Sequence, residues 1–130
     1  MGDRLNISST AIWEDQVGYS RAVRIGNIIE VSGTVSVKQG KIFAPKDAYG
    51  QTKRILRIIE KTLEKAGATM NDVIRTRMYV TDITKWQEIG RAHGEVFHDI
   101  KPVTTMVEVK ALIDQEFMVE IEASAVIQEG

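Results

Sequence analysis

Apolar and polar residues alternate with a period of two in the runs 102–109 and 118–127, near the end of the chain. This period predicts two strands, because successive side chains of a strand point to opposite faces of a sheet. If the two strands pair antiparallel, Glu108, Glu120 and Glu122 gather on one face. Like charges at such short distances repel one another, so we expect this face to need cations, water or a ligand.

Shorter alternating segments predict further strands earlier in the chain, at residues 4–8, 20–25, 28–32 and 72–81. Gly26 and Asn27 form a turn signal between two of them. In the strand 72–81, Ile74, Thr76, Met78 and Val80 are expected on one face and Arg75, Arg77 and Tyr79 on the other. The two arginines are natural partners for the nearby glutamates, and they are also suited to holding a substrate carboxylate.

Two segments repeat apolar residues every three or four positions, which predicts amphipathic helices. The first runs from an N-cap at Asp47 to about Ala66, and Gly67 ends it. The second begins near Thr84, where Thr84-Lys85-Trp86-Gln87 fits a capping box. Its expected buried stripe consists of Trp86, Ile89, His93 and Phe97.

The predicted elements follow the order strands, helix, strand, helix, two strands, and no linker or repeat divides residues 1–130. This order favours one α+β domain with a single sheet and both helices on one face. The other face mixes arginines with glutamates. Two interpretations remain open for it: an ion-pair network in water, or a polar interface between copies of the chain.

The 130 residues carry a net charge of −1 and no cysteine. The near-neutral charge argues against non-specific nucleic-acid binding, and the absence of cysteine excludes disulfides and thiolate chemistry. No apolar run approaches the roughly 20 residues of a membrane span. Because the start has no signal-peptide pattern, we expect a cytoplasmic protein that does not associate with membranes.

Few residues indicate a catalytic or metal-binding role by their type and spacing alone. His93 and His98 are five positions apart, which places them on different sides of a helix, so no metal site is expected. His93 is either a hydrogen-bonded core histidine or a residue that lines a cleft. Ser32 has no recognisable base to activate it; the Ser32-Gly33 pair is expected to shape a turn and to present a hydroxyl and backbone N–H groups. No phosphate-binding loop is present, so no cofactor is expected.

Taken together, the motifs resemble the Rid (RidA/YjgF) family, which is also labelled endoribonuclease L-PSP. The resemblance runs from about residue 18 to residue 127. It rests on these segments: Gly18-Tyr19, Val31-Ser32-Gly33, Leu63-Glu64-Lys65-Ala66-Gly67, Met78-Tyr79-Val80-Thr81-Asp82, Pro102 with Val107-Glu108-Val109, and Val119-Glu120-Ile121-Glu122. It implies a chorismate-mutase-like fold, a homotrimer with clefts between subunits, and hydrolysis of 2-imino or 2-enamino acids to 2-keto acids and ammonia.

The resemblance also implies a set of site residues. Tyr19, Ser32 and Glu120 match cleft positions of the family, and Glu120 would place or activate water. Thr104 stands where active deaminases carry a substrate-binding arginine, Gly90 aligns with a frequent cleft asparagine, and Met106 replaces a small residue or cysteine. Further residues expected to bind substrate are Gly33, His93 and Thr105.

Three hypotheses follow for the function. The first is a hydrolase of reactive imines whose substrate range is altered by Thr104, with Arg75, Arg77, Arg91 or His93 supplying a cation. The second is a trimer that binds a keto or imino acid-like metabolite without turning it over. The third is RNA cleavage, which the near-neutral charge and the lack of a basic aromatic platform disfavour.

Overall fold

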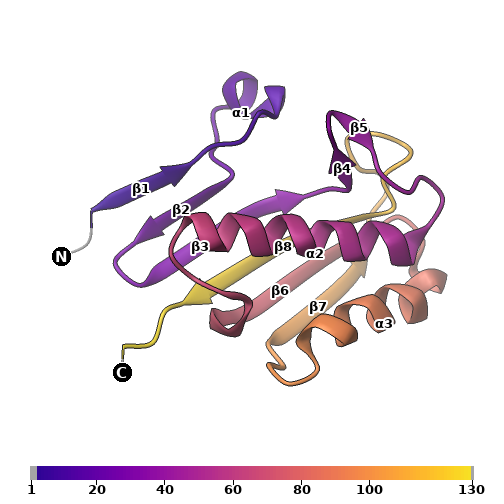
Figure 1. The fold of residues 1–130 in the computed structure, drawn as a ribbon. Helices are drawn as coiled ribbons and strands as arrows, with labels where there is room; N and C mark the ends of the chain where they lie inside the picture. The colour runs from indigo at the N-terminus through magenta and orange to yellow at the C-terminus, as the bar shows by residue number, and fades with distance from the viewer. Residues whose placement is uncertain (1–2, 130) are drawn as a thin grey trace.

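The computed structural model describes residues 3–129, and Figure 1 shows their arrangement. The strands are β1 (Arg4–Ile7), β2 (Ala22–Ile25), β3 (Ile28–Thr34), β4 (Val37–Lys38), β5 (Lys41–Ile42), β6 (Val73–Val80), β7 (Val103–Glu108) and β8 (Val119–Val126). The α-helices are α1 (Ile12–Val17), α2 (Ala48–Lys65) and α3 (Trp86–Phe97), and single 3-10 turns occupy Met70–Asp72 and Ile83–Lys85.

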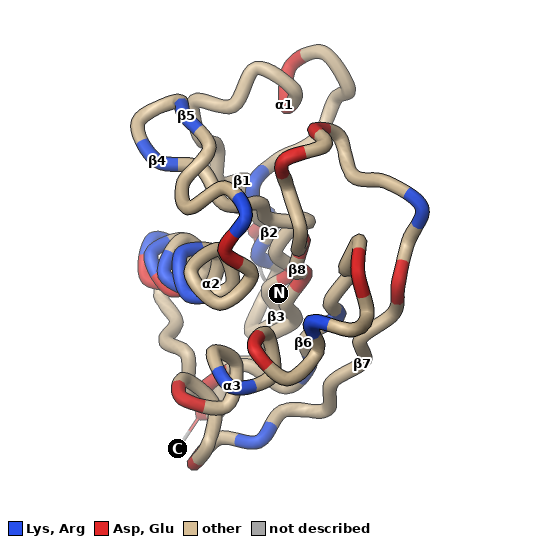
Figure 2. The backbone as a smooth tube through the Cα atoms, turned by 90° about the vertical axis from the view of Figure 1, so that its right-hand side faces the viewer, with Lys and Arg blue, Asp and Glu red and all other residues tan. Residues whose placement is uncertain are grey.

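Six strands form one sheet in the order β1-β2-β3-β8-β6-β7, and β4 and β5 form a separate hairpin. Helices α2 and α3 lie together on one side of the sheet, and no helix layer of the described residues covers its other side (Figures 1 and 2). We call this other side the open face. The α+β class and the single sheet with both helices on one face, which the sequence predicts, are confirmed.

The core lies between this sheet and the two helices. Alternate residues of β8, from Val119 to Ala125, are buried there against the Ile55–Leu63 stripe of α2. The predicted N-cap of α2 is confirmed, because the Asp47 side chain accepts a hydrogen bond from the Gly50 N–H at 2.9 Å. Gly67 follows the helix with φ of +88°, a conformation that suits glycine.

The predicted antiparallel pairing of the last two strands is wrong. β8 lies between β3 and β6 and is antiparallel to both, whereas β7 lies at the edge of the sheet and is parallel to β6. In this register Glu108 is level with Val80, which is buried beneath the helices, so Glu108 is not on the open face. Glu120 and Glu122 alone of the three carboxylates share that face.

Three further predictions need correction. Trp86 lies at the start of α3 with 55% of its surface exposed, outside the buried stripe that Ile89 and Phe97 form. Thr84 does not cap this helix; it lies in the preceding 3-10 turn, which Asp82 caps. A register shift in β6 buries Val73 and exposes Ile74, reversing the expected face of Ile74.

Candidate functional site

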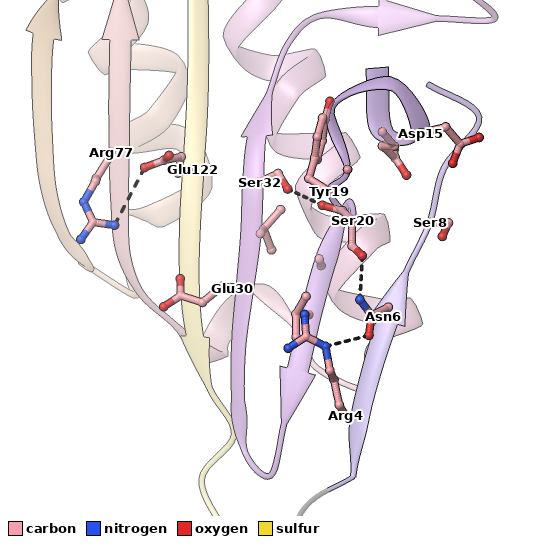
Figure 3. A pocket seen from close by; sticks show the side chains of 15 residues that line it. Arg4, Asn6, Ser8, Asp15, Tyr19, Ser20, Glu30, Ser32, Arg77 and Glu122 are labelled. Atoms are coloured by element: carbon pink, nitrogen blue, oxygen red, sulfur yellow. Dashed lines mark hydrogen bonds and ion pairs between the residues drawn. The ribbon is translucent and has the colours of Figure 1, made fainter. Parts of the chain in front are cut away.

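A hollow of about 850 Å³ occupies the open face between β1, β2, β3, β8 and β6 (Figure 3). We call it the open-face hollow. Polar side chains from β1, β3, β6 and β8 and from the loop after α1 converge on it, and β2 contributes Ala22 and Val23. The polar side chains include Asn6, Tyr19, Ser32, Arg77 and Glu122. Its carboxylates, Glu14, Asp15, Glu30 and Glu122, outnumber its guanidinium groups, Arg4 and Arg77.

Tyr19 reaches the hollow because α1 ends sharply before it. Gly18 adopts φ of +90°, and the N–H groups of Gly18 and Tyr19 both donate to the Glu14 carbonyl, at 2.8 and 2.9 Å. The Glu14 carboxylate is buried and accepts hydrogen bonds from the backbone N–H and the hydroxyl of Ser9. This short helix therefore fixes the loop that carries Tyr19.

Ser32 and Gly33 lie in a bulge of β3. Val31 is paired with Ala123 and Thr34 with Ile121, so Ser32 and Gly33 together lie opposite the single residue Glu122. Bulges of this kind redirect side chains and free backbone groups from the ladder, and they are common beside functional sites. The Ser32 hydroxyl donates to the Ser20 carbonyl at 2.5 Å and lines the open-face hollow.

Glu120 occupies the space that a side chain at position 33 would fill. A Cβ built on Gly33 would lie 2.1 Å from Oε2 of Glu120. Partial burial raises the pKa of the Glu120 carboxyl, the positive charge of Arg21 opposes this shift, and the negative charge of Glu122 adds to it. Glu120 is thus a carboxylate whose proton affinity is increased and whose position depends on a glycine.

Arg21 is a site residue that the sequence reasoning missed. Its Nη2 donates to the Gly33 carbonyl at 2.5 Å. Burial lowers the pKa of the Arg21 guanidinium, and the negative charges of Glu14 and Glu120 oppose this shift. Its Nε is buried and has no hydrogen-bond partner among residues 3–129. Arg21 therefore connects the bulge of β3 to the carboxylate that the bulge accommodates.

Beside Glu120, a second set of polar groups joins β6 to β8. The Tyr79 hydroxyl donates to Glu122 at 3.0 Å, and a guanidinium nitrogen of Arg77 lies 4.0 Å from the same carboxylate. The hydrogen bond to Glu122 raises the pKa of Tyr79. Part of the expected ion-pair network is thus present on the open face. Arg77 remains exposed enough to contact a ligand in the hollow.

Thr104 belongs to a different cluster, on the helix-covered side of the sheet. Its hydroxyl lies 2.8 Å from that of Thr76, which in turn lies 2.9 Å from Nε2 of His93. Burial lowers the pKa of His93, which favours the neutral imidazole, and its ring lies 4.6 Å from that of Phe97. Within one chain this cluster is separated from Glu120 by the sheet itself.

The remaining predicted site residues divide between the two sides. Thr105 is level with Arg77 and shares the open face, whereas Met106 is level with the buried Met78 and packs at the edge of the core. Gly90 lies on α3, where a Cβ would touch only the Trp86 ring, at 3.9 Å. The predicted site residues on the open face are therefore Tyr19, Ser32, Gly33, Glu120 and Thr105. Those on the helix side are Gly90, His93, Thr104 and Met106.

Across residues 3–129, no three His, Asp or Glu side chains converge in a way that would hold a metal ion. None of the helices in this part of the chain is both long enough and apolar enough to cross a membrane.

The fold and the site place the chain in a class of small α+β proteins with a six-stranded sheet, two helices on one face and a glutamate beside a glycine bulge. The profile of the family described as endoribonuclease L-PSP matches residues 10–127. A RutC family protein of Pyrococcus abyssi is 35% identical over 109 residues, covering 82% of this chain and 84% of that protein. The chain belongs to this family, the Rid/YjgF family.

Other relatives agree with this assignment. An uncharacterized protein of Streptomyces coelicolor is 33% identical over 119 residues, which is 92% of this chain and 89% of that protein. The crystal structure of a Mycobacterium tuberculosis member of the YjgF/YER057c/UK114 family has a TM-score of 0.88 and 49% identity, covering 96% of this chain and all of that chain. The YjgF gene product of E. coli has a TM-score of 0.84 and 26% identity, covering 95% and 99%.

Proposed function

We propose that this protein hydrolyses small reactive imines or enamines of 2-amino acids, with Glu120 as the proton-transfer residue. The observation that carries the proposal is the position of Glu120. Its carboxylate is half-buried against Gly33, and its pKa is raised toward the neutral range in which a general base is most effective. Tyr19 and Ser32 line the adjacent hollow and would orient the substrate there.

The proposed reaction is balanced with water as the only co-reactant. An enamine first tautomerises to its imine by exchange of protons with solvent. Glu120 then removes a proton from water as the water oxygen attacks C2 of the imine, and the imine nitrogen takes up a proton from solvent, to which the carbinolamine hydroxyl returns one in the next step. The resulting carbinolamine then collapses: its hydroxyl proton is released, the C–N bond breaks, and the protonated Glu120 supplies the proton with which ammonia leaves. The products are a 2-keto acid and ammonia, and Glu120 returns to its ionised form.

Arg77 is the cation that we assign to the substrate carboxylate. Of the four candidates expected from the sequence, Arg77 alone is among the residues that line the open-face hollow. His93 has a lowered pKa, and the guanidinium of Arg91 lies over the Tyr49 ring at 4.1 Å. A guanidinium can bind a carboxylate through two parallel hydrogen bonds, which the Thr104 hydroxyl cannot do.

We propose further that three copies of the chain assemble through the open face. Within residues 3–129 no helix layer covers this face, and it carries exposed apolar side chains, among them Ile28 and Val103, each 56% exposed. Such an assembly would place the Glu120 group of one copy against the open face of another, so that the cleft is shared between copies. Light scattering should then give three times the 14.6 kDa of one chain; a monomer would contradict the shared cleft.

The activity is tested by ammonia release from freshly generated 2-iminobutyrate and 2-aminoacrylate, with the buffer rate subtracted. Glu120→Gln should lower the enzymatic rate by roughly 10²–10⁴-fold, the usual contribution of general acid–base catalysis. Glu88→Gln, on the exposed surface of α3 and outside the hollow, is the comparison and should lose far less. A wild-type rate equal to that of buffer on both substrates would refute the proposal.

Binding without turnover is the second candidate, and the observation that favours it is the position of Thr104. This residue replaces the expected arginine and is engaged with Thr76 and the Pro102 carbonyl. In this case keto acids such as 2-oxobutyrate would raise the melting temperature while no product formed. Thr104→Arg should then strengthen binding of carboxylates, and unchanged binding would count against the assigned cleft.

RNA cleavage, the activity in the family's description, is not what we propose. The excess of carboxylates over guanidinium groups in the open-face hollow would repel phosphates. RNA binding that weakened steeply with salt would contradict this view.

A further inference from the structure

A second hollow, of about 490 Å³, lies between the segment 9–13, the segment 34–40 and one face of α2. It shares no lining residue with the open-face hollow. A smaller hollow of about 190 Å³ continues from it along α2, and Ser9, Arg21, Arg54 and Ile58 line both. We call these two connected hollows the α1–α2 groove. The groove and the open-face hollow meet at Ser8, which lines both the smaller hollow and the open-face hollow, and Arg21 of the groove also donates to the Gly33 carbonyl.

One part of the α1–α2 groove is apolar. Ile12 and Trp13 contribute from the start of α1, Val35 from the link after β3, Val37 from β4, and Ile58 from α2. Ile12 leaves 67% of its surface exposed in the chain. A ligand with a flat apolar body would cover these side chains and be stabilised by removing them from water.

The other part of the groove is cationic. Arg21 and Arg54 line the larger hollow, and Lys61 and Lys65 join them in the smaller one. Within residues 3–129, neither lining includes an aspartate or a glutamate. Figure 2 shows the basic positions repeated along α2.

The strength of this charge differs among the four residues. Glu14 and Glu120 offset the charge of Arg21, and Glu64 lies 3.9 Å from Lys61. Arg54 has no carboxylate partner within 4.0 Å among the described residues. Its Nε donates to the Val37 carbonyl at 2.8 Å, which fixes the guanidinium beside the groove while leaving its terminal nitrogens available. Lys65 has no such partner either, but it lines only the smaller hollow. Arg21 and Arg54 line both hollows, and because Glu14 and Glu120 offset the charge of Arg21, Arg54 offers an anion the less compensated charge.

We propose that the α1–α2 groove binds a small organic anion that combines a flat apolar body with a phosphate or carboxylate group. The apolar body would lie against Trp13, and the anionic group would bind Arg54, which can hold it with two parallel hydrogen bonds. The volume of the larger hollow falls within the range usual for small-molecule sites.

Tryptophan fluorescence tests the proposal directly, with phenyl phosphate as the probe. Trp13 and Trp86 are the two tryptophans of the chain, and Trp86 is an exposed residue on α3. A Trp86→Phe protein therefore reports on Trp13 alone. Titration should give saturable quenching, weakened roughly tenfold or more by Arg54→Gln, because a charged hydrogen bond is lost. Arg57→Gln, on the same helix but outside the groove, should leave the affinity unchanged.

Further probes test the anionic group and the apolar body of the ligand separately. Inorganic phosphate and benzyl alcohol should each bind more weakly than phenyl phosphate; equal binding of either would overturn the combined recognition. Phenylacetate distinguishes a carboxylate from a phosphate ligand, and binding of either anion supports the proposal. Glu120→Gln should retain binding, so failure of the proposed hydrolysis would leave this result standing. Absence of saturable quenching by both anions, or equal weakening by Arg54→Gln and Arg57→Gln, would overturn the proposal.

Discussion

Replacing Gly33 by alanine should remove activity while sparing the fold. The new Cβ would lie 2.1 Å from Oε2 of Glu120, against 3.4 Å for ordinary contact, so the carboxylate must retreat by at least about 1.3 Å. A misplacement of about 1 Å can lower a catalytic rate by roughly 100-fold. We therefore expect the ammonia-release rate of Gly33→Ala to fall by about two orders of magnitude.

The stability of the same variant should change little. The displaced group is the far end of a flexible side chain, and the φ of Gly33 is not in the left-handed region. Where alanine can adopt the native backbone conformation, replacing glycine by alanine raises the free energy of unfolding by about 0.4–1 kcal/mol, because the unfolded chain has less conformational entropy. This gain offsets the poorer packing of the displaced Glu120 side chain. The melting temperature, followed by circular dichroism, should stay within roughly 5 °C of wild type.

Gly94→Ala provides the matched control for this variant. Gly94 lies within α3, where a Cβ meets nothing within 4 Å. Alanine in a helix interior is favoured over glycine by about 1 kcal/mol, so this variant should be stabilised and fully active. Wild-type activity in Gly33→Ala, or loss of its cooperative unfolding, would refute the assigned contact between Gly33 and Glu120.

Three more predictions concern stability. Gln51→Leu should lower the free energy of unfolding in urea by ~3 kcal/mol, because the buried amide donates to the Glu116 carbonyl at 2.9 Å and accepts from the Met118 N–H at 2.8 Å; a loss below about 1 kcal/mol would contradict this. Asp47→Ala should cost about 1 kcal/mol by removing the cap of α2, and Asp47→Asn should restore most of it in the same titration. The lowered pKa of His93 means that the unfolded chain takes up a proton that the folded chain resists, so its contribution to stability is full above the unfolded pKa of 6.5 and is lost as the pH falls below it. His93→Gln should abolish the His93 contribution to the decrease in the free energy of unfolding between pH 7.5 and 5.5 (roughly one unit either side of the unfolded pKa). His98→Gln should retain this contribution. An equal dependence of the free energy of unfolding on pH in both variants would refute the assignment to His93.

Local signals were sufficient to predict α2, the longer of the two core helices. Asp47 and Gly67 mark the ends of α2 through their own side-chain and backbone chemistry, and the spacing of Ile55, Ile59 and Leu63 gives its buried face. These signals act over a few residues. The α1 helix was missed because its six residues are too few to show a helical period.

Strand partners could not be predicted in the same way. The alternation in 102–109 identifies a strand but not its neighbour, and the crossover through α3 makes β7 parallel to β6. This places β6 between the two strands expected to pair, and it moves Glu108 away from Glu120. The role of Arg21 depends on the bulge at Ser32 and Gly33, which forms only when β3 pairs with β8. The residues next to Arg21 in the sequence therefore give no indication of its contact with Gly33.

The central claim is that Glu120 transfers the proton in hydrolysis, and its own titration tests this most directly. Carbon-13 NMR of the glutamate side chains, assigned with Glu120→Gln, gives the pKa of Glu120, which should lie above the ordinary value of 4.5. The acid limb of the rate of ammonia release should follow the same pKa. In Arg21→Gln both should move upward together, because the nearby positive charge is lost. A rate profile that stays fixed while the Glu120 titration moves would contradict the account.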